Sequence, residues 1–114
     1  MHELCIAISI VDQVISELST EKEGTVSAVH LRLGHLSGVD RAALMFCYSA
    51  ACEGTLLEGS RLVIEEVPVI LYCKICNLET RPPSIQRLTC PSCMDEATVL
   101  HGYELEIVQM ELIA

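Results

Sequence analysis

The spacing of apolar residues changes along the first third of the chain and predicts two different elements. From Leu4 to about Glu21, apolar residues recur every three or four positions, which predicts an amphipathic helix over 4–21. From Thr25 to Gly34, apolar and polar residues alternate, which predicts a half-buried strand whose His30 points to solvent. The helix is expected to bury one stripe of residues, namely Leu4, Ala7, Ile8, Val11, Val14, Ile15 and Leu18.

The middle and the end of the chain predict a second helix and two further strands. The helix is expected over 41–51, with Ser37 three residues ahead of Asp40 as in a capping box and Gly54 as a left-handed cap after its end. The segment 61–71 is rich in Val and Ile, and Pro68 makes it an edge strand or ends its pairing early. A last strand is expected over 103–112, where a change of parity in the apolar set indicates a bulge or burial on both faces.

This order of elements predicts an α+β fold, with a small sheet of about three strands, two helices and an inserted zinc-ribbon-like module. The strands that flank the cysteine-rich segment would pair most economically with each other, so the segment is an insertion and not a tail. We therefore expect one α/β domain, discontinuous in sequence, over 1–71 and 98–114, and a small module over 72–97.

Composition limits the kinds of binding partner and the cellular compartment that fit this sequence. The 114 residues carry seven Lys and Arg against sixteen Asp and Glu, a formal charge of −9. That charge argues against nucleic acid and against an anionic membrane surface, and it favours cations and basic protein surfaces. Neither a secretory signal pattern nor an apolar run of about 18 to 20 residues is found, so we expect a cytoplasmic protein.

Four of the seven cysteines form two C-x-x-C pairs, Cys73 with Cys76 and Cys90 with Cys93, separated by thirteen residues. In a reducing compartment this spacing is typical of a tetrahedral zinc site of ribbon type, and a site closed by four protein ligands is structural. Rubredoxin-type iron uses similar ligands and stays open as an alternative, whereas two symmetric pairs argue against a thioredoxin-like redox centre. The other three cysteines are expected to be packed thiols, namely Cys5, Cys47 and Cys52.

The first three residues can form a second kind of metal site. The α-amino nitrogen of Met1 and the backbone and imidazole nitrogens of His2 can bind one ion in adjacent chelate rings, with Glu3 filling a fourth position. Nitrogens in a plane suit Ni(II) or Cu(II) better than tetrahedral zinc. By spacing alone, however, a histidine at the second position is more often incidental.

Taken together, these segments resemble the HypA (HybF) family of nickel metallochaperones for hydrogenase maturation. The resemblance rests on five segments that span the chain in order: 1–4 (MHEL), 34–40 (GHLSGVD), 53–59 (EGT, then LEG), 62–68 (LVIEEVP) and the two C-x-x-C pairs. It implies a nickel-binding α/β domain and a zinc domain. Nickel would be held by Met1, His2 and Glu3 with Asp40 as a further ligand, and zinc by Cys73, Cys76, Cys90 and Cys93.

The resemblance also implies what the protein does with its metal. It would deliver Ni(II) to the large subunit of nickel-iron hydrogenase in concert with the GTPase HypB, and some members also serve urease. One departure concerns the residue after each pair: several members have histidine there, and this chain has Asn77 and Met94. A pH-driven exchange of zinc ligands is therefore not expected.

A zinc-ribbon interaction or regulatory module that delivers no metal is the alternative from a different class. An enzyme is not expected, because the sequence offers no nucleophile with its base, no paired carboxylates and no open zinc position. The pattern is compatible with a monomer or a homodimer.

Overall fold

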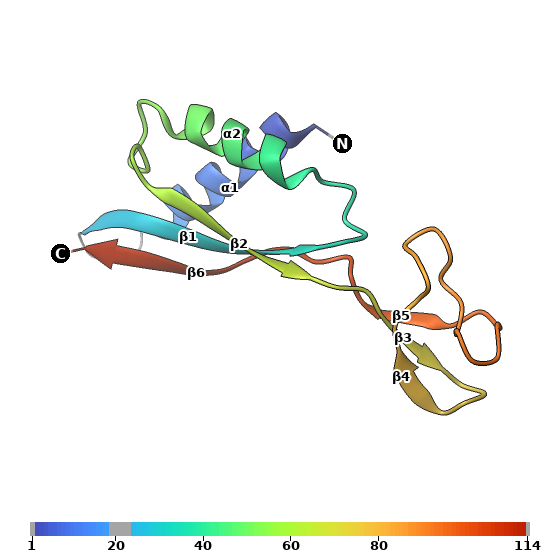
Figure 1. Cartoon of the computed structure of the whole chain (residues 1–114). Coiled ribbons are helices and arrows are strands. Elements are labelled where there is room, and N and C mark those ends of the chain that lie inside the picture. The colour runs from blue at the N-terminus through green and yellow to red at the C-terminus, as the bar shows by residue number, and fades with distance from the viewer. Residues whose placement is uncertain (1, 19–23, 114) are drawn as a thin grey trace. The chain divides into compact units, whose positions relative to one another are not determined.

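A computed structural model describes residues 2–18 and 24–113, and in that part of the chain it shows two helices and six strands (Figure 1). The α+β class predicted above is confirmed, as are two helices with a three-stranded sheet. In chain order the elements are α1 (Glu3–Leu18), β1 (Thr25–Gly34), α2 (Arg41–Cys52), β2 (Arg61–Val67), β3 (Ile70–Cys73), β4 (Leu78–Thr80), β5 (Thr98–His101) and β6 (Leu105–Ile113).

The strands form two sheets, and the chain divides into two compact units. One sheet has the strand order β2-β1-β6 and the other β4-β3-β5. The first unit comprises residues 1–31, 39–65 and 106–114, and the second comprises 32–38 and 66–105. The domain boundaries expected from sequence, at 71/72 and 97/98, stay a prediction about where independently folding parts begin.

The core of the first unit lies between the two helices and the sheet, and both helices lie on the same side of that sheet (Figure 1). Tyr48 and Leu44 of α2 pack there with Val29 and Leu31 of β1. Apolar burial of this kind is the main favourable term in folding.

Helix α1 buries most of the predicted stripe, since Ala7, Val11 and Val14 are buried and Ile15 and Leu18 pack against the core. Leu4 and Ile8, expected inside, are exposed, whereas Ile10 is buried and Ile6 is partly buried against the core. The helix is apolar around much of its circumference, so several stripes of period 3.6 fit the sequence equally well. Packing against the sheet selects one of them, and the predicted residues 19–21 of the helix lie outside the described part.

Helix α2 begins one turn later than a Ser37 cap would place it. Its N-cap is Asp40, whose Oδ2 accepts a hydrogen bond from the Ala43 amide at 2.9 Å. The predicted capping box is therefore wrong, and Asp40, the acid of that box, is itself the cap. At the other end, Gly54 has φ +75°, as predicted for a left-handed residue after the helix.

The sheet topology corrects one prediction and confirms two. Strand β1 lies between β2 and β6, and β3 belongs to the other sheet, so the predicted pairing of 61–71 with 103–112 is wrong. Ile70 of β3 instead faces His101 of β5, a strand that was not predicted. Strand β2 ends at Val67, immediately before Pro68, and Ile107 and Met110 of β6 both pack against the core, which is the predicted change of parity.

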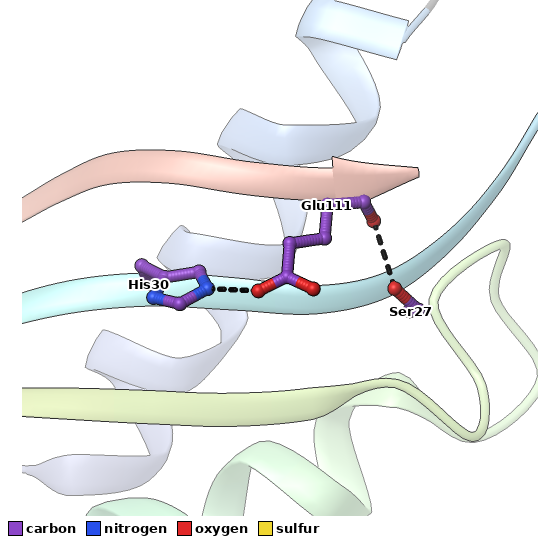
Figure 2. Close-up of polar contacts among 3 residues, drawn as sticks. All are labelled: Ser27, His30 and Glu111. Carbon is purple, nitrogen blue, oxygen red and sulfur yellow. Dashed lines mark hydrogen bonds and ion pairs between the residues drawn. The ribbon is translucent and has the colours of Figure 1, made fainter. Parts of the chain in front are cut away.

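Polar side chains join β1 to β6 on the side of the sheet away from α1 (Figure 2). His30 Nε2 lies 2.5 Å from Glu111 Oε2, and Ser27 Oγ donates to the Glu111 carbonyl at 3.2 Å. We expected His30 to point to solvent, and instead it is half-buried and in contact with the Glu111 carboxylate. Because the two residues are 81 positions apart, this contact helps to fix the register of two strands that no short turn connects.

The second unit is closed by backbone contacts around Gly34. The Gly34 amide donates to the Glu104 carbonyl at 2.7 Å, and the Leu36 amide donates to the Gly102 carbonyl at 2.6 Å. The His35 amide donates to the Val67 carbonyl at 3.0 Å. Three chain segments that are far apart in sequence are thereby held together beside the strands that lead to the cysteines.

Candidate metal centres

The two C-x-x-C pairs adopt the same local turn. After Cys73, the last residue of β3, the Asn77 amide donates to the Cys73 carbonyl at 2.8 Å, and the Met94 amide donates to the Cys90 carbonyl at the same distance. Asn77 and Met94 also share a left-handed backbone, with φ of 57° and 68°. This repeated turn points both sulfurs of each pair to one side, which is what a shared metal requires.

The four sulfurs converge and form the group that we call the cysteine cluster: Cys73, Cys76, Cys90 and Cys93. All of them lie within 4.8 Å of one another, with 3.5 Å between the sulfurs of Cys73 and Cys93 and 3.9 Å between those of Cys76 and Cys90. Four sulfurs placed tetrahedrally at the zinc–sulfur distance of ~2.3 Å would be ~3.8 Å apart. The spacing therefore fits a four-coordinate ion, and it is far too long for disulfides.

The thiols differ in acidity because of their hydrogen bonds. The sulfur–sulfur contact with Cys90 raises the pKa of Cys76 to about 12, and the Cys93 amide lowers the pKa of Cys90 to about 7. A bound cation needs all four thiolates, so metal binding at this cluster must release protons.

The protein shields the cysteine cluster from solvent to different degrees at its four residues. Cys73 and Cys90 are fully buried, and Cys76 and Cys93 are half-buried. Tyr72 lends support from β3, since its hydroxyl donates to the side-chain oxygen of Asn77 at the first turn. With four protein ligands and no open position, the arrangement is suited to holding structure and not to activating water.

The residues predicted to bind nickel are described only in part. Met1 lies outside the described residues, and His2 is exposed directly before α1. The structure brings together the other two, because Glu3 Oε2 accepts a hydrogen bond from the Asp40 amide at 3.0 Å. That bond lowers the pKa of Glu3, so its carboxylate is ionised at neutral pH. The sequence indicated each residue separately, but it gave no sign that they would touch.

The remaining cysteines and histidines do not gather into a further site. Cys47 and Cys52 pack into the core as predicted, whereas Cys5 is exposed, which contradicts its predicted burial and follows from the shifted first part of the α1 stripe. His35 lies 3.3 Å from Glu66, and His101 lies 3.1 Å from Glu104. Over residues 2–18 and 24–113, only the cysteine cluster brings three or more ligand side chains together.

Sequence reasoning missed the special backbone of Asn77 and Met94. A left-handed residue directly after the second cysteine is required by the turn, and asparagine is the non-glycine residue that accepts this conformation most readily. The position after each C-x-x-C pair was therefore a usable signal.

Among the described helices, none is long and apolar enough to span a bilayer.

Comparisons with known proteins identify the family. A family model described as "Hydrogenase/urease nickel incorporation, metallochaperone, hypA" matches residues 1–112. The chain is 45% identical over 114 residues to a hydrogenase maturation factor HypA from Roseiflexus sp. (strain RS-1), covering 97% of this chain and 91% of that one. It is 41% identical to a protein of the same name from Streptomyces avermitilis, covering 96% of this chain and 86% of that one.

A solved structure shares the fold. The solution structure of the Ni metallochaperone HypA from Helicobacter pylori aligns with a TM-score of 0.70 at 21% identity, over 100% of this chain and 99% of that one. The family description is that of a metallochaperone, which confirms that the chain is not an enzyme. From the match over almost its whole length, together with the cysteine cluster, we conclude that the chain belongs to the HypA family of nickel metallochaperones for hydrogenase maturation.

Proposed function

We propose that the protein binds Ni(II) at its amino terminus and delivers it to the large subunit of nickel-iron hydrogenase during maturation. Met1, His2 and Glu3 would supply the ligands, with Asp40 as a further one. The proposal is supported by the family match, which begins at residue 1, and by the names of the similar proteins. The GTPase HypB would assist the transfer, and urease maturation proteins are a second class of recipient.

The observation that carries the proposal is the contact between Glu3 and Asp40. It connects the first turn of α1 to the N-cap of α2 across 37 residues of sequence. The Ile6 amide donates to the His2 carbonyl at 3.2 Å, so His2 occupies the cap position of α1. Amides at the start of a helix have no acceptor within that helix. The backbone nitrogens of residues 2 and 3 are therefore not committed to hydrogen bonds within the helix.

Charge at this place also favours a cation. The Glu3 carboxylate uses one oxygen to accept from the Asp40 amide, and the Asp40 carboxylate uses one oxygen to accept from the Ala43 amide. Imidazole must be neutral to bind, so acidification should weaken nickel binding, and so should a partner that offers competing ligands.

We further propose that the cysteine cluster holds Zn(II) permanently and that the protein acts in the cytoplasm, as a monomer or a homodimer. The sulfur spacing and the closed, half-buried setting support zinc, because this ion accepts four thiolates in a tetrahedron. Seven cysteines without a disulfide among the described residues are compatible with a reducing compartment. Zinc at this position would supply structure, while nickel would be cargo.

The test is a nickel titration of the full chain with its native start, compared with three altered forms. His2→Ala and acetylation of the Met1 α-amino group should each weaken nickel binding by at least about tenfold, because each removes one nitrogen from the set. His101→Ala is the matched control, since His101 is an exposed histidine of the second unit that pairs with Glu104. Equal nickel binding by all four proteins would refute the proposal and favour a zinc-ribbon module that delivers no metal.

A further inference from the structure

Strand β6 forms one edge of the sheet β2-β1-β6, and no strand of the described part pairs with its outer side (Figure 1). Alternate residues of an edge strand direct their N–H and C=O groups away from the neighbouring strand. At nine residues β6 is long, and it contains neither proline nor lysine, the residues that usually protect such an edge. The edge is therefore able to accept another strand.

A groove runs beside this edge. It has a volume of about 340 Å³ and is lined by Gln13, Val14 and Glu17 of α1 and by residues 107–110 of β6. Val108 is 47% exposed, although it stands beside a core in which Val14 is buried. An added strand would place every second side chain toward this groove, where apolar side chains would cover the exposed valine.

The charge of the surroundings selects the kind of strand. The first unit has eleven acidic residues against three basic ones, so it carries −8 of the formal charge of −9. Glu17 lines the groove, and Glu106 and Glu111 are the two charged residues of β6. A strand that brought lysine or arginine to this edge would meet opposite charges across the pair, and an acidic strand would be repelled.

The same charges disfavour a second copy of the chain. If two β6 strands paired antiparallel with Val108 opposite Gln109, each Glu106 would face a Glu111 of the other copy. Like charges directly opposite destabilise a strand pair, and two first units that each carry −8 repel one another.

We propose that the outer edge of β6, with the groove beside α1, binds an extended segment of a partner protein in which apolar residues alternate with lysine or arginine. The partner adds a fourth strand to the sheet β2-β1-β6. Backbone hydrogen bonds supply the general affinity, the groove takes the apolar side chains, and the net negative charge of the first unit favours the basic ones. This surface consists of residues other than the proposed nickel ligands, so its existence does not depend on nickel binding.

The test uses a synthetic peptide of alternating valine and lysine, as long as the nine-residue β6. Calorimetric titration into the full chain should show binding that weakens as salt is raised, because exposed charges are screened. A peptide of alternating valine and glutamate should bind at least about tenfold more weakly. Equal binding of the two peptides, or no binding of the lysine peptide, would overturn the proposal.

Two variants locate the surface. Val108→Lys places a positive charge on the edge and should weaken binding of the lysine peptide by at least about tenfold. Phe46→Lys is the matched control, because it makes the same change at an apolar side chain of α2 that is 77% exposed, and it should leave binding unchanged. An equal effect of both variants would show that only net charge matters and would refute the assignment to β6.

Two measurements on the unmodified chain remove any dependence on how the variants fold. Amide hydrogen exchange should slow within residues 106–113 when the lysine peptide is present, because a paired edge protects its N–H groups. Slowing confined to other segments would contradict the proposal. Sedimentation equilibrium tests whether a second copy of the chain binds the β6 edge. If the chain alone forms a dimer and Val108→Lys abolishes that dimer, the edge is occupied by a second copy and our proposal is overturned.

Discussion

Replacing Gly34 by alanine should destabilise the second unit severely, although the backbone conformation of Gly34 suits any residue. A Cβ atom added there would lie 2.0 Å from the Gly102 carbonyl oxygen, 2.3 Å from its carbon and 2.6 Å from the Glu104 nitrogen. All three contacts are with backbone, so no side chain can rotate away. The clash can be relieved only if the two chain segments separate.

The expected loss of stability follows from the hydrogen bonds that break when the two chain segments separate. The Gly34 amide bonds the Glu104 carbonyl at 2.7 Å, and the Leu36 amide bonds the Gly102 carbonyl at 2.6 Å. Losing two hydrogen bonds costs about 2 kcal/mol, and strain from overpacking adds about 1 to 3 kcal/mol, so we expect a loss of about 3 to 5 kcal/mol. That is a large share of the stability of a small domain, which is about 5 to 15 kcal/mol in all.

The assay is urea unfolding of the full chain, with amide hydrogen exchange to separate the two units. Gly38→Ala is the control, since Gly38 lies in the same connecting segment, has φ +77° and has no atom within 4 Å of an added Cβ. It should cost only the left-handed backbone penalty of about 1 to 2 kcal/mol. If Gly34→Ala costs no more than Gly38→Ala, or if the loss falls on the first unit alone, the argument from close backbone approach is wrong.

Other changes have smaller or more local consequences. Asp40→Ala should lower the free energy of unfolding by about 1 kcal/mol through loss of the α2 cap, and Asp40→Asn should not, as thermal unfolding would show. The Asp40 amide lowers the pKa of Glu3 below 4.5, so the stability contributed by Glu3 is present above pH 4.5 and disappears as the pH falls through its folded value; Glu3→Gln should flatten that acid limb of the unfolding midpoints. Tyr48→Phe leaves the Ser60 hydroxyl without its partner at 2.7 Å and should cost about 1 kcal/mol in urea unfolding. Stripping metal from the cysteine cluster with a chelator should end amide protection in β3 and β5 while α1 and α2 keep theirs.

The parts of the fold that were predictable depend on strong local signals. The strand over 25–34 has the predicted bounds, because alternation between two faces is unambiguous when one face is buried. The cysteine cluster was predictable because tetrahedral coordination constrains both the residue type and the spacing within each pair. The family could be recognised for a similar reason, since short motifs at Met1–Leu4, Gly34–Asp40 and the two cysteine pairs follow one another in a fixed order.

The predictions that failed concern contacts between segments that are distant in sequence. Only the first part of the α1 stripe was misplaced, because Ile6, Ile8 and Ile10 are chemically equivalent and only the sheet beneath the helix distinguishes them. Pairing across the cysteine segment was predicted from chain economy, but β1 is the most thoroughly buried strand and takes the central position, where both of its edges are covered.

The candidate nickel site shows the same limit at the level of single atoms. Glu3 and Asp40 could each be chosen from the sequence, yet the hydrogen bond between them arises only because the helices α1 and α2 start side by side. The donor of this bond is the backbone amide of Asp40, so the bond could not be predicted from the Asp40 side chain. It also means that Asp40 can help to organise the site without contacting nickel. Asp40→Asn keeps both the amide and the helix cap but removes the charge, so unchanged nickel affinity in that variant would assign Asp40 to positioning, and a lowered affinity would assign it to the ligand set.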